Sequence, residues 1–249
     1  MGKIQCVYDK DIVAITEAVV GIAEGNYATV DEIANAIKDN FKTGHIGVLF
    51  PILSRNRFAV LLSAMARAMD KITLQISYPS DEVGNDILDK SRLKEYNINP
   101  YSHVITSEEY YEKFGDFKHI FTGVNMVDFY KDLIEKENCE VEIVLANDPT
   151  KVLDYVKDVL VCDIHTRINT KRAIMEKATG KVLGMDEICN ESVNGSGYNT
   201  HYGLYGSNRS TEERVKLFPH KHDDIVYKIQ DMLKERTGKT IEVMIYGDG

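Results

Sequence analysis

The residue types best suited to ligand binding are concentrated near the carboxyl end of the chain. Residues 190–210, NESVNGSGYNTHYGLYGSNRS, contain four glycines and almost no aliphatic side chains. Glycine lets backbone N–H groups approach a ligand closely, and serine and asparagine add neutral polar groups. This pattern predicts a ligand pocket, with a long surface loop as the alternative. The candidate residues are Gly195, Ser196, Asn199, Gly203, Ser207 and Asn208.

A second candidate follows at the end of the sequence. The apolar run TIEVMIY predicts a strand, and it leads directly into Gly247, Asp248 and Gly249. A strand that ends in Gly-Asp-Gly delivers a carboxylate to the carboxyl edge of a sheet. A carboxylate in that position suits Mg²⁺ or Mn²⁺ beside nucleotide phosphates, so Asp248 is the predicted metal ligand. A tight turn is the alternative.

Two predicted strands in the middle of the chain end in polar residues. One strand runs into SRNR and a later one into CDIHTR. Ligands of open parallel sheets bind beyond the carboxyl ends of the strands, where helix N-termini present free N–H groups. Hydroxyl, guanidinium and imidazole groups there predict an anion or phosphate site, unless they cap helices and pair with nearby carboxylates. The candidates are Ser54, Arg55, Arg57, His165 and Arg167.

Several familiar sites are not supported by the sequence. Neither GxxxxGK[ST] nor GxGxxG is present, so a P-loop kinase and a typical dinucleotide dehydrogenase are both unsupported. Cys162 and His165 supply only two possible zinc ligands, too few for a zinc site. The four cysteines are far apart in sequence, which favours reduced thiols in a cytoplasmic protein.

The elements that must position these residues predict an α/β fold. From Gly44 to about Asp186, short apolar runs alternate with amphipathic segments, as in a Rossmann-like or flavodoxin-like doubly wound sheet. One such segment, beginning at Asp81 after Ser80, is expected to be a helix. We expect residues 44–189 to be a block inserted into a split α+β unit. That unit comprises residues 1–43 and 190–249.

Composition limits the partners of the chain. The 249 residues include 30 Lys and Arg against 39 Asp and Glu, which gives a formal charge of −9. Such an acidic chain is unsuited to general binding of nucleic acid or anionic membrane, because both require a field of basic residues. No apolar run approaches the roughly 20 residues that cross a bilayer. The N-terminus also lacks the pattern of a secretory signal.

Both ends of the sequence resemble the coenzyme F420-0:L-glutamate ligase family. DIVAITEAVVGIAEGN is similar to that family's strand DVLVVT followed by KIVSKAEG. YGLYGSN, KLFP, a helix with TGK, and IEVMIYGD resemble its AGIDxSN loop, LLP, helix and strand ending in SD. Gly203, Ser207 and Asn208 match the loop, and Asp248 matches the aspartate that helps to bind metal.

The middle of the chain resembles a large insertion in a bacterial branch of the same family. GVLFPILSRNRF, SYPSDEVGN, FTGV, CDIHTR and NGSGYN are strings familiar from that branch. Family members also continue beyond the GD motif and begin earlier, so the resemblance implies a chain shortened at both ends. Tyr205 stands where the family's loop has an acidic residue.

The resemblance implies a nucleotide-dependent amide ligase. GTP or ATP phosphorylates the carboxylate of an acceptor, and the amine of L-glutamate then displaces phosphate, with Mg²⁺ or Mn²⁺ neutralising charge. The acceptor is either F420-0-like or folate-like. On this hypothesis the glycine-rich residues line the nucleotide or acceptor pocket, no catalytic residue is assigned, and a homodimer is conceivable. The alternative is a non-catalytic small-ligand-binding or regulatory protein with degenerate ligase-like flanks, which Tyr205 favours.

Overall fold

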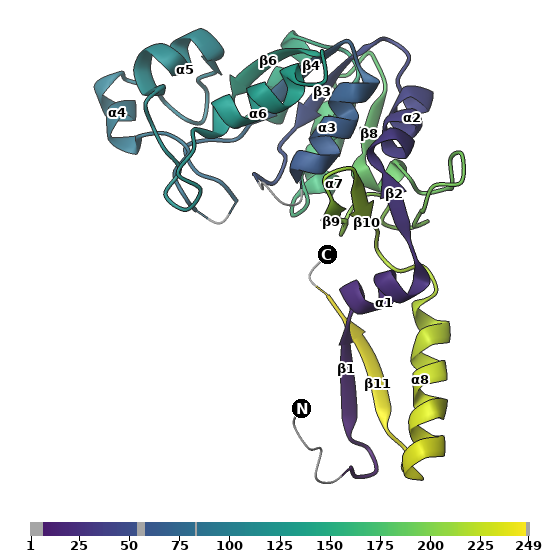
Figure 1. Ribbon diagram of the computed structural model, residues 1–249. Helices are drawn as coiled ribbons and strands as arrows, with labels where there is room; N and C mark the ends of the chain where they lie inside the picture. Colours follow the sequence, from purple (N-terminus) through teal and green to yellow (C-terminus); the bar gives the residue numbers. More distant parts are fainter. Residues whose placement is uncertain (1–6, 54–57, 83, 248–249) are drawn as a thin grey trace.

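The computed structural model describes residues 7–53, 58–82 and 84–247. Its strands form sheets of six, three and two members. Figure 1 shows the six-stranded sheet and its helices as one large body, with the two-stranded sheet in a narrower body beside it. The three-stranded sheet lies where the two bodies meet. The predicted α/β fold class is confirmed.

The six-stranded sheet is almost entirely parallel. Its spatial order is β5-β6-β4-β3-β7-β8, and only the short edge strand β5 runs antiparallel. Numbered by their order in the chain, the five parallel strands follow the order 3-2-1-4-5 found in doubly wound sheets. The strands are β3 (His45–Leu49), β4 (Lys71–Ile76), β5 (Ile105–Thr106), β6 (Glu140–Leu145), β7 (Val159–Val161) and β8 (Val182–Gly184).

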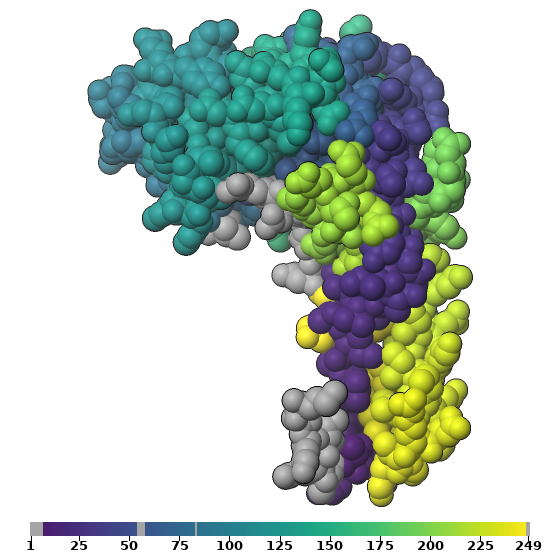
Figure 2. All heavy atoms as spheres, in the orientation of Figure 1, coloured from purple at the N-terminus to yellow at the C-terminus, as the bar shows by residue number. Residues whose placement is uncertain are grey.

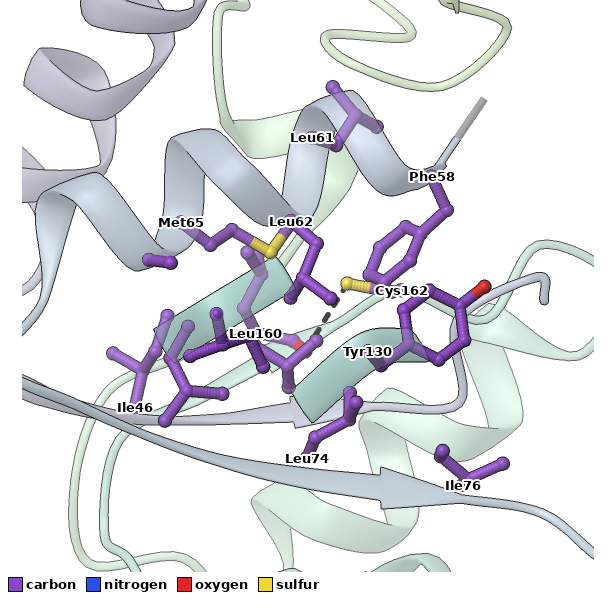
Figure 3. Packing of buried hydrophobic residues seen from close by; sticks show 14 of the residues in the cluster. Ile46, Phe58, Leu61, Leu62, Met65, Leu74, Ile76, Tyr130, Leu160 and Cys162 are labelled. Carbon is purple, nitrogen blue, oxygen red and sulfur yellow. Dashed lines mark hydrogen bonds between the residues drawn. The ribbon is translucent and has the colours of Figure 1, made fainter. Parts of the chain in front are cut away.

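Helices cover both faces of this sheet. Helices α3 (Phe58–Ala68) and α6 (Met126–Glu135) pack on one face through a large core, in which Leu62, Met65 and Leu160 are fully buried (Figure 3). The 3-10 helix η1 (Pro149–Asp154) and helix α7 (Arg167–Met175) pack on the other face around a second core. Gly47 lets η1 approach β3, since a Cβ there would overlap Val152 and Val156.

The long connection from β4 to β6 carries two further helices before α6. They are α4 (Lys90–Glu95) and α5 (Ser107–Phe114). The helix expected from Asp81 is wrong over its first half, because Ser80 and Asp86 pair in an isolated bridge and helix α4 begins only at Lys90.

The three-stranded sheet joins the two ends of the chain. It contains β2 (Tyr27–Thr29), β9 (Asn208–Thr211) and β10 (Arg214–Lys216), all antiparallel, with β10 in the centre. Helix α2 (Val30–Asn40) follows β2, and its N-terminus is capped because Thr29 and Glu32 form a reciprocal capping box. The apolar face of α2 packs against α3 in the large core.

The narrow body contains the predicted first and last strands. Strands β1 (Ile12–Thr16) and β11 (Glu242–Tyr246) pair in parallel, and α1 (Glu17–Glu24) and α8 (His222–Thr237) accompany them (Figure 1). No residue of α8 is fully buried. The domain boundaries at 43/44 and 189/190 stay a prediction.

Candidate functional site

The six-stranded sheet has a topological switch point between β3 and β7. These strands are neighbours, yet the chain leaves β3 toward α3 on one face and leaves β7 toward α7 on the other. Connections that diverge in this way leave a crevice beyond the carboxyl ends of the strands, which is the usual ligand site of such sheets. A cavity of about 290 Å³ occupies this position.

The cavity is built from the segments that follow four strands. The β3 end contributes Phe50, Pro51 and Ile52, and the other ends contribute polar groups. Those polar groups are Ser77 and Glu82 after β4, Asn147 after β6, and Asp163, His165 and Thr166 after β7.

The β3 end of the crevice has an unusual backbone. Phe50 has φ +50°, a left-handed conformation that a bulky residue rarely adopts. Its N–H still donates to the Gln75 carbonyl at 3.0 Å, and the Gln75 side chain donates to the carbonyls of Ala146 and Asp148. These bonds tie together the ends of β3, β4 and β6. Strained backbone held by its surroundings is concentrated at functional sites.

At the β7 end, a carboxylate lies beside the N-terminus of helix α7. Asp163 accepts hydrogen bonds from the Thr166 N–H at 3.1 Å, from the Thr170 hydroxyl at 2.6 Å and from the Thr166 hydroxyl. This carboxylate places negative charge beside the positive end of α7, which disfavours an anionic ligand there. The polar groups of the neighbouring segments are thus the better candidates for contact with a ligand.

Glu82 and His165 both line the crevice, and their side chains interact electrostatically. Desolvation by the surrounding protein raises the pKa of the Glu82 carboxylate, and the negative charge of Asp81 raises it further. The N–H of Leu53, which donates to Glu82 Oε2 at 3.4 Å, and the neighbouring His165 act in the opposite direction. A carboxyl group that holds its proton to a higher pH can both donate and accept protons during a reaction.

The predicted anion-binding residues are distributed unequally. His165 lines the crevice. Arg167 does not, because its Nη1 donates to the Ile164 carbonyl at 2.7 Å and its guanidinium lies 4.9 Å from the Tyr205 ring centre. Ser54, Arg55 and Arg57 lie outside the described residues.

The predicted glycine-rich residues chiefly organise their own loop. Ser196 Oγ accepts from the Val193 N–H, and Asn199 joins the loop to Pro219 while accepting from two backbone N–H groups. Gly203 has φ +51° and packs against three carbonyls, where a Cβ would not fit. The remaining positions are Gly195 at φ +83° beside open space, Ser207 buried beside a cavity of about 20 Å³, and Asn208 at the start of β9.

Comparison with known protein families identifies the family of this chain. A model of the F420-0:gamma-glutamyl ligase family matches residues 3–249, which include all three sheets. The chain belongs to this family. The expected relationship to gamma-glutamyl ligases is therefore confirmed, and with it membership of a family of ligases that act on small molecules. No curated protein and no solved structure matches the chain.

Tyr205 occupies the loop position at which the resemblance to the ligase family leads us to expect an acidic residue. Its hydroxyl donates to the Asp163 carbonyl at 2.9 Å, and burial raises its pKa. The phenol therefore stays neutral and its oxygen is already engaged. Instead of offering a charged metal ligand, Tyr205 joins the glycine-rich loop to the β7 end of the crevice.

The predicted metal ligand of this family member, Asp248, lies outside the described residues. The preceding Gly247 packs against Glu17, and a Cβ at Gly247 would overlap that carboxylate. Among residues 7–53, 58–82 and 84–247, no three His, Cys, Asp or Glu side chains are grouped so as to hold a metal ion.

Sequence reasoning missed Ser77 and Glu82, although it noted the string that contains them. SYPSDEVGN follows a strand, and the rule that ligands meet strand ends applies to it as well as to CDIHTR. The sequence pattern of this segment indicates the start of a helix, which hides its place at the crevice. In the described part of this ligase-family chain, no helix combines the length and apolar character needed to cross a membrane.

Proposed function

We propose that the chain is a nucleotide- and divalent-metal-dependent gamma-glutamyl ligase. It joins L-glutamate to a carboxylated acceptor through an amide bond. The match to the ligase family over residues 3–249 is the observation that carries this proposal. The switch-point crevice supports it by offering a polar cavity at the place where parallel sheets bind nucleotides.

The proposed reaction has two steps. An acceptor carboxylate oxygen attacks the γ-phosphorus of GTP or ATP, the bond to the β-phosphate oxygen breaks, and an acyl phosphate and a nucleoside diphosphate result. The glutamate amine then attacks the acyl carbon, phosphate leaves with the bonding electrons, and the amine loses a proton. Since both steps place anions together, we propose Mg²⁺ or Mn²⁺ as a requirement, with Asp248 as its predicted ligand.

We assign three roles to the crevice. Ser77 and His165 can donate hydrogen bonds to nucleotide oxygens, and the Glu82 carboxylate can accept the proton that the amine loses. The hydrogen-bonded end of β3 and the bonds between Asp163 and Thr166 support these groups on both sides of the crevice. The predicted glycine-rich residues stay candidates for the acceptor side of the pocket.

The test is product formation by the full chain. We expect a product about 129 Da heavier than the acceptor, the mass of one glutamyl unit, when GTP or ATP, Mn²⁺ or Mg²⁺, L-glutamate and F420-0 or a folate are supplied. His165→Asn should lower kcat/KM by about tenfold or more, whereas His222→Asn, in an exposed position on α8, should not.

One outcome would decide against the ligase reaction, and another against the roles assigned to the crevice. One is the absence of a mass shift and of glutamate-dependent phosphate release with every acceptor and both nucleotides. Tight binding of a small ligand under those conditions would establish the non-catalytic alternative. The other is full activity of His165→Asn, which would remove the crevice from the reaction while leaving the ligase assignment intact.

A further inference from the structure

The connection between β4 and β6 contains a buried histidine–carboxylate pair to which the reaction above assigns no role. His119 Nε2 lies 3.4 Å from Asp81 Oδ2, and the two side chains are 7% and 5% exposed. Figure 2 shows the blue and teal atoms of this connection as a lobe of the large body that reaches away from the narrow body. Burial of a carboxylate costs free energy unless hydrogen bonds compensate for it, so the partners of Asp81 determine what the pair does.

Asp81 fixes the backbone directly before Glu82. Its carboxylate accepts from the Asn85 N–H at 2.7 Å and from Asn85 Nδ2 at 2.9 Å. Its own N–H donates to the Asn85 carbonyl at 2.7 Å, and its carbonyl accepts from the Gly84 N–H at 3.1 Å. Because Asp81 is bonded through its side chain and both backbone groups, its position determines where the Glu82 side chain begins.

His119 belongs to a separate and well-anchored loop. Its N–H donates to the Val124 carbonyl at 2.9 Å, and its carbonyl accepts from the Gly123 N–H at 2.8 Å. Asn125, at the end of this loop, caps helix α6. The imidazole is therefore held by the start of α6, and its contact with Asp81 joins two distant segments.

The hydrogen bonds of the imidazole determine its tautomer. His119 Nδ1 accepts from the Thr122 N–H at 3.4 Å. A ring nitrogen that accepts a hydrogen bond carries no proton, so the neutral ring has its proton on Nε2. Nε2–H therefore donates to Asp81 Oδ2.

Glu82 connects this pair to the crevice. It lines the cavity, and its Oε2 accepts from the Leu53 N–H beyond the end of β3. Desolvation raises the pKa of Glu82, the charge of Asp81 raises it further, and His165 acts in the opposite direction. Asp81 thus affects both the position of the Glu82 carboxylate and its affinity for a proton.

We propose that His119 is a positioning residue for Glu82. Its Nε2–H holds Asp81, and Asp81 in turn keeps the Glu82 carboxylate beside the β3 end, where it can accept the proton of the glutamate amine. Neither His119 nor Asp81 lines the crevice, so His119 acts through Asp81 and not on a substrate. This assignment rests on the proposed function, in which Glu82 is the proton acceptor.

Titration of Glu82 tests the link without turnover. The full chain is labelled with ¹³C at the glutamate carboxyl groups, and the signal that Glu82→Gln removes is followed by NMR as pH changes. His119→Phe keeps a ring but loses the donor. We expect it to lower the pKa of Glu82, because a loosened segment lets water reach the carboxylate and desolvation is the main cause of the raised pKa.

Two further variants make this test specific. His119→Gln retains a side-chain N–H donor and should keep most of the titration of the parent protein. His103→Phe is the matched control, because His103 forms another histidine–carboxylate pair, with Glu109 at 3.0 Å, and does not line the crevice.

The rate of an active ligase supplies a second measurement. His119→Phe should lower kcat about tenfold and leave the nucleotide KM within about twofold, since the proton acceptor is displaced while the nucleotide contacts remain. Asp81→Ala breaks the same link, so adding His119→Phe to it should cause little further loss of kcat.

The outcomes separate this proposal from the ligase assignment. An unchanged Glu82 titration in His119→Phe, equal effects of His119→Phe and His119→Gln, or additive losses of kcat in the double variant would overturn the role of His119 and leave the ligase reaction standing. If His119→Phe does not fold, an unchanged Glu82 titration in Asp81→Ala would overturn it instead. A titration shifted by His119→Phe and restored by His119→Gln, in a protein without turnover, would support the positioning link and contradict the ligase.

Discussion

The two parallel sheets of this molecule differ sharply in how they are covered. The six-stranded sheet has a packed core on each face, and Ile46, Ile72 and Leu160 within it are inaccessible to solvent. The β1–β11 sheet leaves one face open, where Ile12 is 66% and Tyr246 is 51% exposed. Parallel sheets are normally buried on both faces.

This contrast indicates where the protein can hold ligand groups most rigidly. Loops at the edge of a fully packed sheet inherit the rigidity of the strands below them, so the crevice after β3 and β7 is a fixed site. The β1–β11 pair has few buried contacts and should open locally at much lower free energy. The groups that hold the nucleotide are thus expected on the large sheet, whereas the predicted metal ligand, Asp248, follows β11 of the small one.

The largest expected effect comes from the same substitution made in both sheets. Ile72→Ala should lower the free energy of unfolding by about 2 to 5 kcal/mol, because it removes a fully buried side chain from β4. Ile12→Ala should change it by less than about 0.5 kcal/mol, since this side chain on β1 is mostly in water. Urea unfolding followed by circular dichroism measures both. Equal losses would contradict the contrast.

A smaller effect is expected where the hairpin is attached to the large body. Arg67 on α3 bonds carboxylates of α2, of the turn after α6 and of the hairpin. Arg67→Met should cost about 1 kcal/mol, since two of the three carboxylates are well exposed and solvent weakens their attraction. Lys42→Met, which removes the exposed pair with Asp39, is the control and should be neutral. A neutral Arg67→Met would show that apolar packing alone attaches the hairpin.

The smallest effect concerns pH. Partial burial, followed by the charge of Lys71, lowers the pKa of His45 at the start of β3, where Nε2 lies 2.9 Å from the Thr73 hydroxyl. The unfolded chain therefore takes up this proton at higher pH than the folded one, and stability falls as pH drops below about 6.5.

Comparison of variants isolates the contribution of His45 to the pH dependence of stability. In His45→Gln the loss of stability between pH 7 and pH 5.5 should become shallower, whereas His222→Gln should keep the slope of the parent protein. Thermal melts at each pH provide the measurement. A steeper slope in His45→Gln would show that His45 stabilises the fold at low pH, which is the opposite of this prediction.

Local sequence signals predicted much of the fold, because strands buried on both faces appear as uninterrupted apolar runs such as HIGVL and KITLQI. The cap at Thr29 was equally visible, since Thr and Glu three residues apart satisfy the first turn together. Strands β9 and β10 were missed because NRST and RVK are short and polar and become strands only by pairing with β2.

The sequence predicted the place of the candidate site at the strand ends, but not all of the residues that line it. The strand order places His165 at the switch point. The rule that ligands bind beyond the carboxyl ends of parallel strands predicted this residue. Arg167 is only two residues later, yet the first turn of α7 directs it to Tyr205 instead. Only the packing of distant segments decides such orientations, and the pairing of Glu82 with the β3 end depends on the same long-range contacts.

Hydrogen exchange in the presence of nucleotide tests the central claim most directly. The account predicts that GTP or ATP with Mn²⁺ slows amide exchange in peptides covering residues 77–82 and 162–170, at the switch point, and leaves the β1 and α8 peptides unchanged. Protection confined to residues 195–208, or no protection with either nucleotide, would contradict a nucleotide site at the β3–β7 crevice.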